Sequence, residues 1–426
     1  MPVKWIVLAG AAVMYALVIM FPAKKSFSAL GAAVFMVVLG AVTQFAAVTE
    51  LIDWTVLMIF VGSLVIAELF LYSRAPAAIA DGIIRASPNV GVAIIAILIM
   101  TGFISAFVEN VATVLVMAPI ALALCKKLNM DPTYFLVGLA VMANLQGTAT
   151  LVGDPPSMIF ADYTGYGFND FFIFQGKLSI FFAVQTGMAA GAVFFYGWFA
   201  KKGGKITVEQ EKIKTPVPSI LLLAMIGGLA AASFIFGGLT IVSGLLVMAL
   251  ALAGILWYAL VRKAGRAEIW KLVKGLDWDT ALFLAGIFVV VGAVAEVGLL
   301  RDFSAFLAHV VGRNVALGFA LIVAVSVLIS GFVDNVPYII VMLPVAADLA
   351  KTLSLRPELY MFALLIGSCM GGNLTPFGAS ANIVSVGILK KQGVPVNFLQ
   401  WLKIGFPFTL LTTAAASAMV WFVWRH

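Results

Sequence analysis

The chain has 426 residues, of which 63% are apolar and only 11% are charged, and its mean hydropathy is +1.12. A soluble globular chain carries about 25% charged residues, whereas the apolar stretches here recur at roughly 20 residues, the length that crosses a bilayer. Composition therefore excludes an ordinary soluble domain and predicts an all-α polytopic membrane protein. The net charge of +7 is attributed to Lys and Arg in cytoplasmic loops, so no nucleic-acid partner is expected.

Ten membrane crossings are predicted in chain order, at about 3–21, 28–48, 54–72, 133–163, 178–199, 217–236, 239–261, 278–296, 358–386 and 404–424. Two further apolar pairs, 89–107 with 111–125 and 315–332 with 336–350, have second arms of about 15 residues, which is short for a crossing. We expect both pairs to be re-entrant hairpins, which a membrane tolerates where the irregular tip is buried in protein or lines a cavity. Each half then has five crossings.

Positive charge predicts the orientation. Lys and Arg divide 19 to 7 between the two sides of the predicted topology, and the richer side includes the loop 200–216. Because Lys and Arg accumulate in cytoplasmic loops, we expect this loop inside and both termini outside the cell inner membrane.

The two halves of the chain are similar to each other at an offset of 225 positions. A chance match between apolar segments would align Leu, Val and Ala, but here the aligned residues are Ser, Asn, Pro, Gly and Thr. The clearest pairs are Ser105 with Ser330, Asn110 with Asn335, Pro119 with Pro344, Gly147 with Gly372 and Thr150 with Thr375. Because five is an odd number, the second copy enters the membrane inverted. The sequence therefore predicts two inverted repeats, 1–200 and 217–426, joined by a cytoplasmic linker, 201–216, an organisation typical of secondary transporters.

Each predicted repeat has two polar interruptions. One is the hairpin tip; the other is a break inside the next span, at 144–157 and 371–382, where Gly and Pro stop a continuous helix. Helix N-termini there expose backbone amides that must meet partners, water or a solute. The side-chain and backbone groups suit a small polar solute or a hard cation. The predicted substrate-binding residues are Ser105, Asn110, Thr113, Asn144, Gly147, Thr148, Thr150, Ser330, Asn335, Gly372, Asn373, Thr375, Ser380 and Asn382.

Three acidic residues lie nearest these interruptions: Glu109, Asp154 and Asp334. An acid at the bilayer centre costs about 2.5–3.5 kcal/mol on insertion scales, so it is usually functional and often relays protons. We predict that these three carry protons or bind a coupling cation. The alternative is that Asp154, which precedes two prolines, only caps a half-helix and that the tip acids lie in wet vestibules.

The sequence argues against other functional classes. The two Cys and two His residues form no metal-ligand spacing, and neither His309 nor His426 lies near an interruption, so we predict no metal, no catalytic residue and no enzyme. A channel would need a continuous polar or constricted pore, and paired hairpins fit alternating access better. No phosphate-binding loop is present, so a proton or sodium gradient, or a partner ATPase, must supply the energy, and no cofactor is expected.

Three patterns, found in four segments, carry a resemblance to a known family. The segments 109–119 and 334–344 resemble an acid/Asn-Asn-x-x-Thr hairpin pattern, 147–156 is close to Gly-x-Ala-x-x-x-Gly-Asp-Pro-Pro, and 295–307 is similar to Glu-Ser-Gly-Phe-Phe-Glu. These patterns are those of the ion transporter superfamily, in its arsenite permease and pigmentation P protein branch, and the resemblance covers nearly the whole chain. It implies an elevator or rocking motion of a site-bearing half against a scaffold, often in a homodimer.

The resemblance leaves the solute open, because arsenite permeases, sodium/proton antiporters and dicarboxylate carriers share this architecture. Dicarboxylate carriers have Ser-Asn-Thr at both tips, whereas the tips here read Glu-Asn-Val at 109–111 and Asp-Asn-Val at 334–336. A carboxylate repels a dianion but suits a cation or a neutral hydroxide such as arsenous acid. We expect efflux of arsenite or antimonite by proton antiport, with sodium/proton antiport as the alternative and a dicarboxylate or other anion as the third choice.

Overall fold

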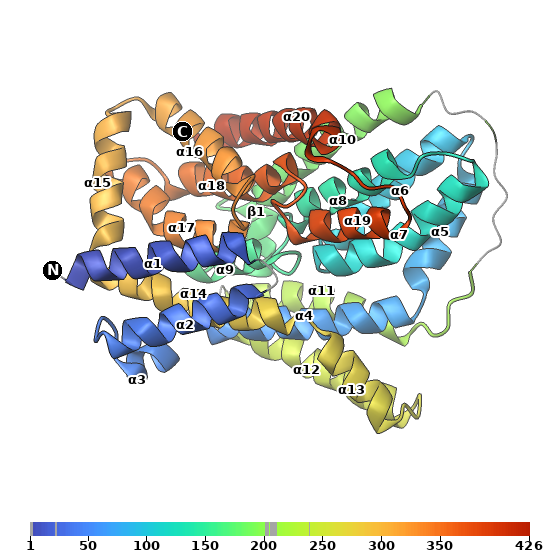
Figure 1. Cartoon of the computed structure of the whole chain (residues 1–426), viewed down its shortest axis with the longest axis horizontal. Helices are drawn as coiled ribbons and strands as arrows, with labels where there is room; N and C mark the ends of the chain where they lie inside the picture. The colour runs from blue at the N-terminus through green and yellow to red at the C-terminus, as the bar shows by residue number, and fades with distance from the viewer. Residues whose placement is uncertain (1–2, 22–23, 201–203, 205–210, 238) are drawn as a thin grey trace.

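The computed structural model describes residues 3–21, 24–200, 204, 211–237 and 239–426 (Figure 1). The described residues are predominantly helical, so the predicted helical membrane class is confirmed. A small hairpin of β1 (Ile173–Phe174) and β2 (Lys177–Leu178) was not predicted. Most of the predicted linker, at 201–203 and 205–210, lies outside the described residues.

The first half contains ten α-helices with short π and 3₁₀ turns among them. They are α1 (Val3–Met20), α2 (Lys25–Val38), α3 (Gln44–Ala46), η2 (Ala47–Leu51), α4 (Trp54–Tyr72), α5 (Ala75–Ala86), α6 (Val90–Ser105), α7 (Asn110–Lys127), α8 (Thr133–Gly147), α9 (Pro155–Thr164), η3 (Phe168–Phe171) and α10 (Ile180–Phe199).

The second half follows a similar order. Its helices are α11 (Val217–Phe236), α12 (Thr240–Leu260), α13 (Arg266–Gly275), α14 (Trp278–Glu296), α15 (Leu299–Val311), α16 (Val315–Ser330), α17 (Asn335–Thr352), α18 (Pro357–Gly371), η4 (Gly372–Leu374), α19 (Ser380–Lys391) and α20 (Phe398–Trp424).

Two predicted lengths are wrong. The crossing expected at 28–48 is a helix of only 14 residues that ends at Val38, because Gly40 adopts a positive φ of 76° and turns the chain. The second arms of the two hairpins, α7 and α17, have 18 residues each rather than about 15, since each helix continues through an internal proline.

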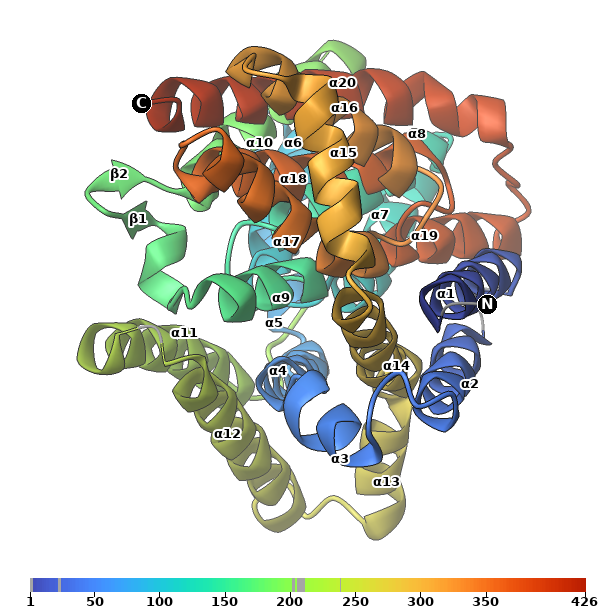
Figure 2. The same cartoon turned by 90° about the vertical axis from the view of Figure 1, so that its left-hand side faces the viewer.

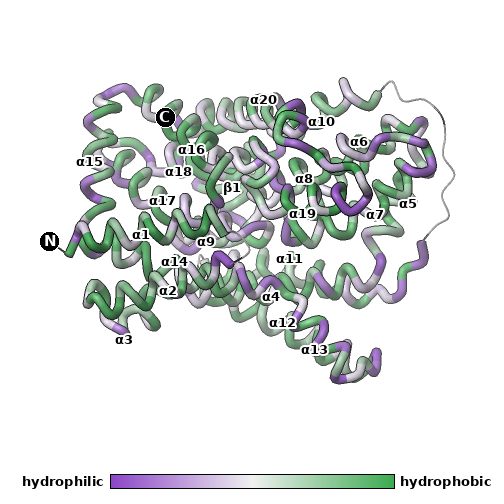
Figure 3. The backbone as a smooth tube through the Cα atoms, viewed as in Figure 1, coloured by the Kyte–Doolittle hydropathy of each residue, from purple (hydrophilic) through white to green (hydrophobic). Residues whose placement is uncertain are grey.

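Within the described ranges, eight helices are long and apolar enough to cross a membrane: α1, α4, α7, α10, α11, α12, α14 and α20. The outer faces of α11 and α12 are apolar although they are exposed, with Phe234 83% and Leu252 54% accessible. Such a surface requires an apolar solvent, which for a bundle of long apolar helices is lipid. Hydrophilic residues gather at the ends of the molecule, near α5 and the free end of α13 (Figure 3). The chain is therefore a multi-pass membrane protein.

The helices form two groups (Figures 1 and 2). One contains α6 to α10 with α16 to α20, and the other contains α1, α2, α4 and α11 to α14. Corresponding helices of the two halves exchange partners, since α4 packs on α12 while α14 packs on α2, and α10 packs on α20. The helices α5 and α15 run across the direction of most others, at opposite ends of the molecule (Figure 1).

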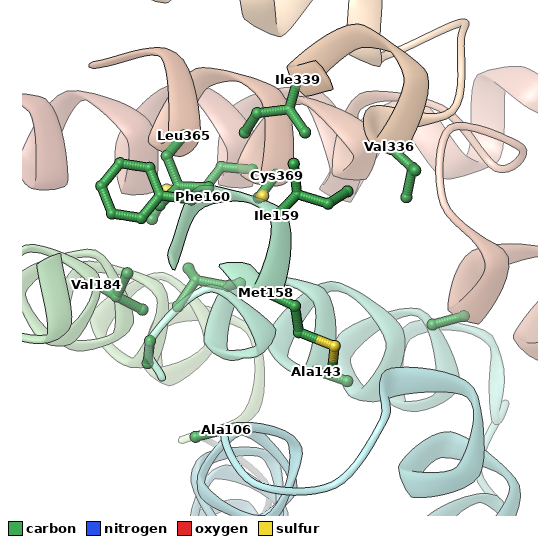
Figure 4. Close-up of a cluster of buried hydrophobic side chains, with 14 of the residues drawn as sticks. Ala106, Ala143, Met158, Ile159, Phe160, Val184, Val336, Ile339, Leu365 and Cys369 are labelled. Carbon is green, nitrogen blue, oxygen red and sulfur yellow. The ribbon is translucent and has the colours of Figure 1, made fainter. Parts of the chain in front are cut away.

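The short helix α9 lies where the two halves meet. Its Met158 points toward Ala143 of α8, whereas Ile159 and Phe160 point toward residues of α17 and α18 such as Leu365 (Figure 4). All three α9 side chains are at most 5% exposed. Packing on both sides holds the N-terminus of α9 at the centre of the bundle.

Candidate functional site

The two hairpin tips start a helix in the same way. Glu109 Oε2 accepts a hydrogen bond from the Ala112 amide at 2.9 Å, and Asp334 Oδ1 accepts one from the Val336 amide at 3.0 Å. An acidic oxygen at a helix N-terminus satisfies an orphan donor and complements the helix dipole. The predicted helix starts at Asn110 and Asn335 are therefore confirmed.

The predicted helix breaks are also confirmed. In the first half α8 ends at Gly147 and α9 begins at Pro155, and in the second half α18 ends at Gly371 and α19 begins at Ser380. Each break is tied to the neighbouring hairpin tip by a threonine. Thr150 donates its hydroxyl proton to the Ala106 carbonyl, and Thr375 donates to the Gly331 carbonyl. The hydroxyl groups of these two threonines therefore link each break to its tip.

Close packing at the first break requires glycine. A Cβ atom added to Gly147 would lie 2.5 Å from Asn110 Oδ1, and one added to Gly153 would lie 2.4 Å from the Gly147 carbonyl oxygen. The Asn110 amide itself is fixed, because its Oδ1 accepts from the Ser105 hydroxyl at 2.6 Å. The glycines therefore allow the tip and the break to approach each other within the membrane.

Asp154 occupies the centre of this arrangement. It precedes α9 as its N-cap residue, yet its side chain makes no capping hydrogen bond to that helix. Its side chain instead lines a small cavity together with Asn110 and Asn335, one residue from each hairpin tip. The alternative that Asp154 only caps a half-helix would require a capping hydrogen bond from its side chain, which the structure does not show.

Lys25 reaches the same place from the other helix group. Its Nζ lies 3.1 Å from Asp334 Oδ2, and the two side chains are only 11% and 23% exposed. The ammonium also lies 5.1 Å from the centre of the Phe283 ring, where the ring face attracts a cation. The predicted topology places Lys25 among the lysines of the cytoplasmic side, whereas the structure shows it as a buried partner of a site carboxylate.

A cavity of about 40 Å³ lies among these groups. It is lined by Lys25, Phe60, Glu109, Asn110, Asn144, Asp154, Pro155, Asp277, Thr280, Asp334, Asn335, Val336, Ala379, Ser380 and Ala381. Four of these side chains are acidic and one is basic, so the lining favours positive charge. A wider cavity of about 720 Å³ adjoins it, sharing Lys25, Asp334 and Ser380 and adding apolar residues such as Phe332 and Phe377.

Seven predicted site residues line the small cavity: Glu109, Asn110, Asn144, Asp154, Asp334, Asn335 and Ser380. The other predicted residues do not appear in its lining as the described residues define it. Ser105 and the two break threonines instead hold the tips, and Ser330 donates to the Ser368 carbonyl. Thr113 donates to the Val108 carbonyl at 3.3 Å. Gly147, Thr148 and Gly372 are buried within the breaks.

Sequence reasoning missed Lys25, Asp277 and Thr280. Asp277 is the N-cap of α14, where its Oδ1 accepts from the Thr280 amide at 3.0 Å. In the sequence, Lys25 and Asp277 are charged residues at the start of apolar segments. The same pattern occurs at ordinary loop ends, so it does not identify site residues. Among the described residues, no group of three or more His, Cys, Asp or Glu could hold a metal ion.

Comparison with known proteins places this geometry in a family. The family model described as "Citrate transporter" matches residues 15–367 and 321–426. The chain belongs to the CitMHS citrate transporter family. CitMHS proteins and the relatives of this chain are transporters, so it is a membrane transporter and not an enzyme. The expected membership in the ion transporter superfamily is thereby confirmed, whereas arsenite permease specificity remains a proposal.

Several CitMHS relatives span most of the chain. An uncharacterized transporter of Mycobacterium tuberculosis is 32% identical over 429 residues, covering 96% of this chain and 95% of that protein. An uncharacterized transporter of Synechocystis is 25% identical over 341 residues, 76% of each chain. The P protein of Sus scrofa is 25% identical over 397 residues, which cover 75% of this chain and 47% of P protein.

Two solved structures share the fold. The YdaH transporter of Alcanivorax borkumensis has a TM-score of 0.59 at 15% identity, with 91% of this chain and 88% of that chain covered. MtrF of Neisseria gonorrhoeae has a TM-score of 0.55 at 16% identity, with 92% and 84% covered. At such low identity the likeness extends to the fold alone.

Proposed function

We propose that this CitMHS protein is a secondary active transporter that exchanges protons for a small inorganic solute bound in the central cavity. The observation that carries the proposal is the lining of the 40 Å³ cavity, in which Glu109, Asp154, Asp277 and Asp334 face a single Lys25. Carboxyl groups inside a membrane protein are suited to take up and release protons. Solute and proton then compete for the same oxygen atoms, and this competition couples their movements.

Arsenite or antimonite is our first choice of solute, exported in exchange for protons. Arsenous acid is uncharged at neutral pH and presents hydroxyl donors, which match a lining rich in carboxylate and amide oxygens. The adjoining cavity of about 720 Å³ provides further room for such a molecule beside the small one. The acidic tip residues and the resemblance to arsenite permeases support this choice.

Sodium/proton antiport is the second candidate, and the cavity volume favours it. A volume of about 40 Å³ is more than the roughly 10–15 Å³ of this kind that one water molecule requires. A dehydrated monovalent cation fits this space without widening. Excess negative charge around it offsets the loss of hydration.

Citrate, which gives the family its description, and dicarboxylates rank third. Two acids within about 4 Å of a bound carboxylate repel it, at about 4 kcal/mol per pair for an effective dielectric constant of 20. The small cavity would also have to expand several-fold. The helix N-termini at the tips cannot offset this repulsion, because Glu109 and Asp334 already occupy them.

The architecture we propose is a pair of inverted repeats, 1–200 and 217–426, each with a re-entrant hairpin and a broken helix. The support is the recurrence of contacts: the same threonine-to-tip hydrogen bond in both halves, and the exchanged packing of α4 with α12 and α14 with α2. We further propose that the group bearing the tips moves against the other group, in a homodimer of the cell inner membrane with both termini outside.

Transport into everted membrane vesicles under an imposed proton gradient tests the proposal. Arsenite, sodium and citrate are offered separately, and Asp154→Asn serves as the variant because Asp154 lines the cavity together with residues of both hairpin tips. We expect accumulation of arsenite that collapses when the gradient is dissipated, and loss of accumulation in the variant.

Accumulation that ignores the proton gradient would exclude proton exchange. Gradient-dependent movement of sodium without arsenite would establish the second candidate in place of the first. Selective accumulation of citrate would refute the assignment of the acidic cavity to cations and neutral hydroxides.

A further inference from the structure

Three buried asparagines connect the two helix breaks next to the small cavity. Asn144 lies on α8, Asn373 in η4 and Asn382 on α19, and their side chains are 3%, 0% and 0% exposed. Asn144 Nδ2 donates to Asn373 Oδ1 at 2.9 Å and to Asn382 Oδ1 at 2.8 Å. The first half thus contributes one amide to a pair from the second half.

The backbone fixes the direction of these amides. Asn382 Nδ2 donates to the carbonyl oxygens of Gly372 and Thr375, both at 2.9 Å. Asn373 Nδ2 donates to the Val141 carbonyl oxygen at 3.1 Å. A backbone carbonyl only accepts hydrogen bonds, so Asn373 and Asn382 must turn their own oxygens toward Asn144.

Asn144 therefore uses both N–H donors and has only its oxygen left. That Oδ1 is buried without a hydrogen-bond partner among the described residues, and Asn144 lines the small cavity. An unpaired buried carbonyl oxygen costs roughly 1–3 kcal/mol, so one in a residue that lines a cavity indicates a position where a bound water, ion or solute can satisfy it.

We propose that Asn144 Oδ1 is a direct ligand of the transported solute or coupling ion, held in place by Asn373 and Asn382 as positioning residues. The atom accepts hydrogen bonds and coordinates cations, but it offers nothing to an anionic oxygen. The site thus favours a cation, or a neutral hydroxide with an O–H donor, over an anion. This inference rests on the proposed function for the identity of the site, and it assigns separate roles to three residues that the sequence grouped together.

The assignment differs from a purely structural role of the asparagines. If they only held the breaks together, replacing Asn382 would change stability but not the preference among solutes. If they orient a ligand, replacing Asn382, which does not belong to the cavity lining, weakens solute binding as much as replacing Asn144 does.

Direct binding to the purified full-length protein tests this. Calorimetric titrations with sodium chloride, arsenite at pH 7 and citrate, against a choline chloride background, are compared for wild type, Asn144→Leu, Asn144→Asp and Asn382→Leu. Gln146→Leu is the matched control, because Gln146 is another buried amide of α8 that pairs with Gln185 at 3.1 Å, outside the cavity lining. Thermal unfolding of each variant verifies that it is folded.

We expect the wild type to bind sodium or arsenite but not citrate. Asn144→Leu and Asn382→Leu should weaken that binding about 10- to 100-fold, the range for losing one hydrogen bond to a charged or strongly polar partner. Asn144→Asp keeps an acceptor oxygen but loses both N–H donors to Asn373 and Asn382, so it should also weaken binding. Gln146→Leu should bind like the wild type.

Unchanged binding in Asn144→Leu would overturn the assignment, as would citrate binding that depends on Asn144 or wild-type protein that binds none of the three probes. Loss of stability in Asn382→Leu with unchanged affinity would restrict Asn382 to a structural role and likewise contradict the proposal. Because the readout is binding, a failure of proton coupling in vesicles would refute the proposed function without deciding this test.

Discussion

Replacing Lys25 by Gln should destabilise the protein far more than a lysine-to-glutamine change normally does. The substitution removes the ammonium that lies 3.1 Å from Asp334 and leaves that carboxylate among the other acids of the small cavity. The exposed fractions of 11% and 23% mean that little water replaces the lost partner. Breaking a buried ion pair by removing one charge costs about 3–5 kcal/mol, and the partial exposure of Asp334 favours the lower end.

Two further variants distinguish the loss of this ion pair from a general effect of mutation on stability. Lys25→Gln combined with Asp334→Asn removes both charges and should recover most of the lost free energy of unfolding. Lys4→Gln is the matched control, because Lys4 pairs with Asp302 in an exposed setting, at 31% and 65% accessibility. An exposed pair contributes only about 0–1 kcal/mol.

The free energy of unfolding is measured by denaturant titration of the purified protein in mixed micelles, followed by tryptophan fluorescence. Equal losses in Lys25→Gln and Lys4→Gln would refute the buried pair. A double variant that is less stable than Lys25→Gln alone would show that Asp334 does not carry the uncompensated charge.

Three further changes test other parts of the site. Asp154→Asn should abolish the proton dependence of transport while the protein still folds, as measured by pH-jump uptake in proteoliposomes, since an amide cannot release a proton. Gly147→Ala should lower the free energy of unfolding by about 1–3 kcal/mol, because its Cβ would lie 2.5 Å from a tip amide oxygen. Gly227→Ala is the control, since its Cβ meets nothing within 4 Å and should not destabilise the protein. Equal stabilities of the two variants would contradict the close approach of tip and break. Thr375→Val should lower the free energy of unfolding by roughly 1–3 kcal/mol, because it leaves a buried tip carbonyl unpaired. Thr352→Val, at an exposed helix end, should change the stability little. Equal proteolysis rates for the two variants would argue against a stabilising hydrogen bond from Thr375 to the tip.

The amino-acid sequence by itself determined the class of protein and the places where helices stop. Sixty-three per cent apolar residues leave no alternative to a bilayer, and Gly and Pro interrupt helices by local steric and hydrogen-bonding rules that need no tertiary context. For the same reason the helix starts at Asn110, Asn335 and Pro155 were predicted correctly. The length of α2 was not, because a single glycine turn ended an otherwise apolar run.

Only the tertiary structure decided which charges share the site. Lys25 and Asp334 are 309 positions apart and meet because α2 packs on α14 beside the second hairpin tip. In the sequence Lys25 is one more lysine between two apolar segments, indistinguishable from a cytoplasmic loop residue. The three asparagines likewise all lay in predicted breaks, but Asn144 meets Asn373 and Asn382 across 229 and 238 positions, and the Val141 carbonyl that orients Asn373 lies 232 positions away. Local rules place polar groups at a break, whereas the folded chain decides which of them face the cavity and which atom each presents.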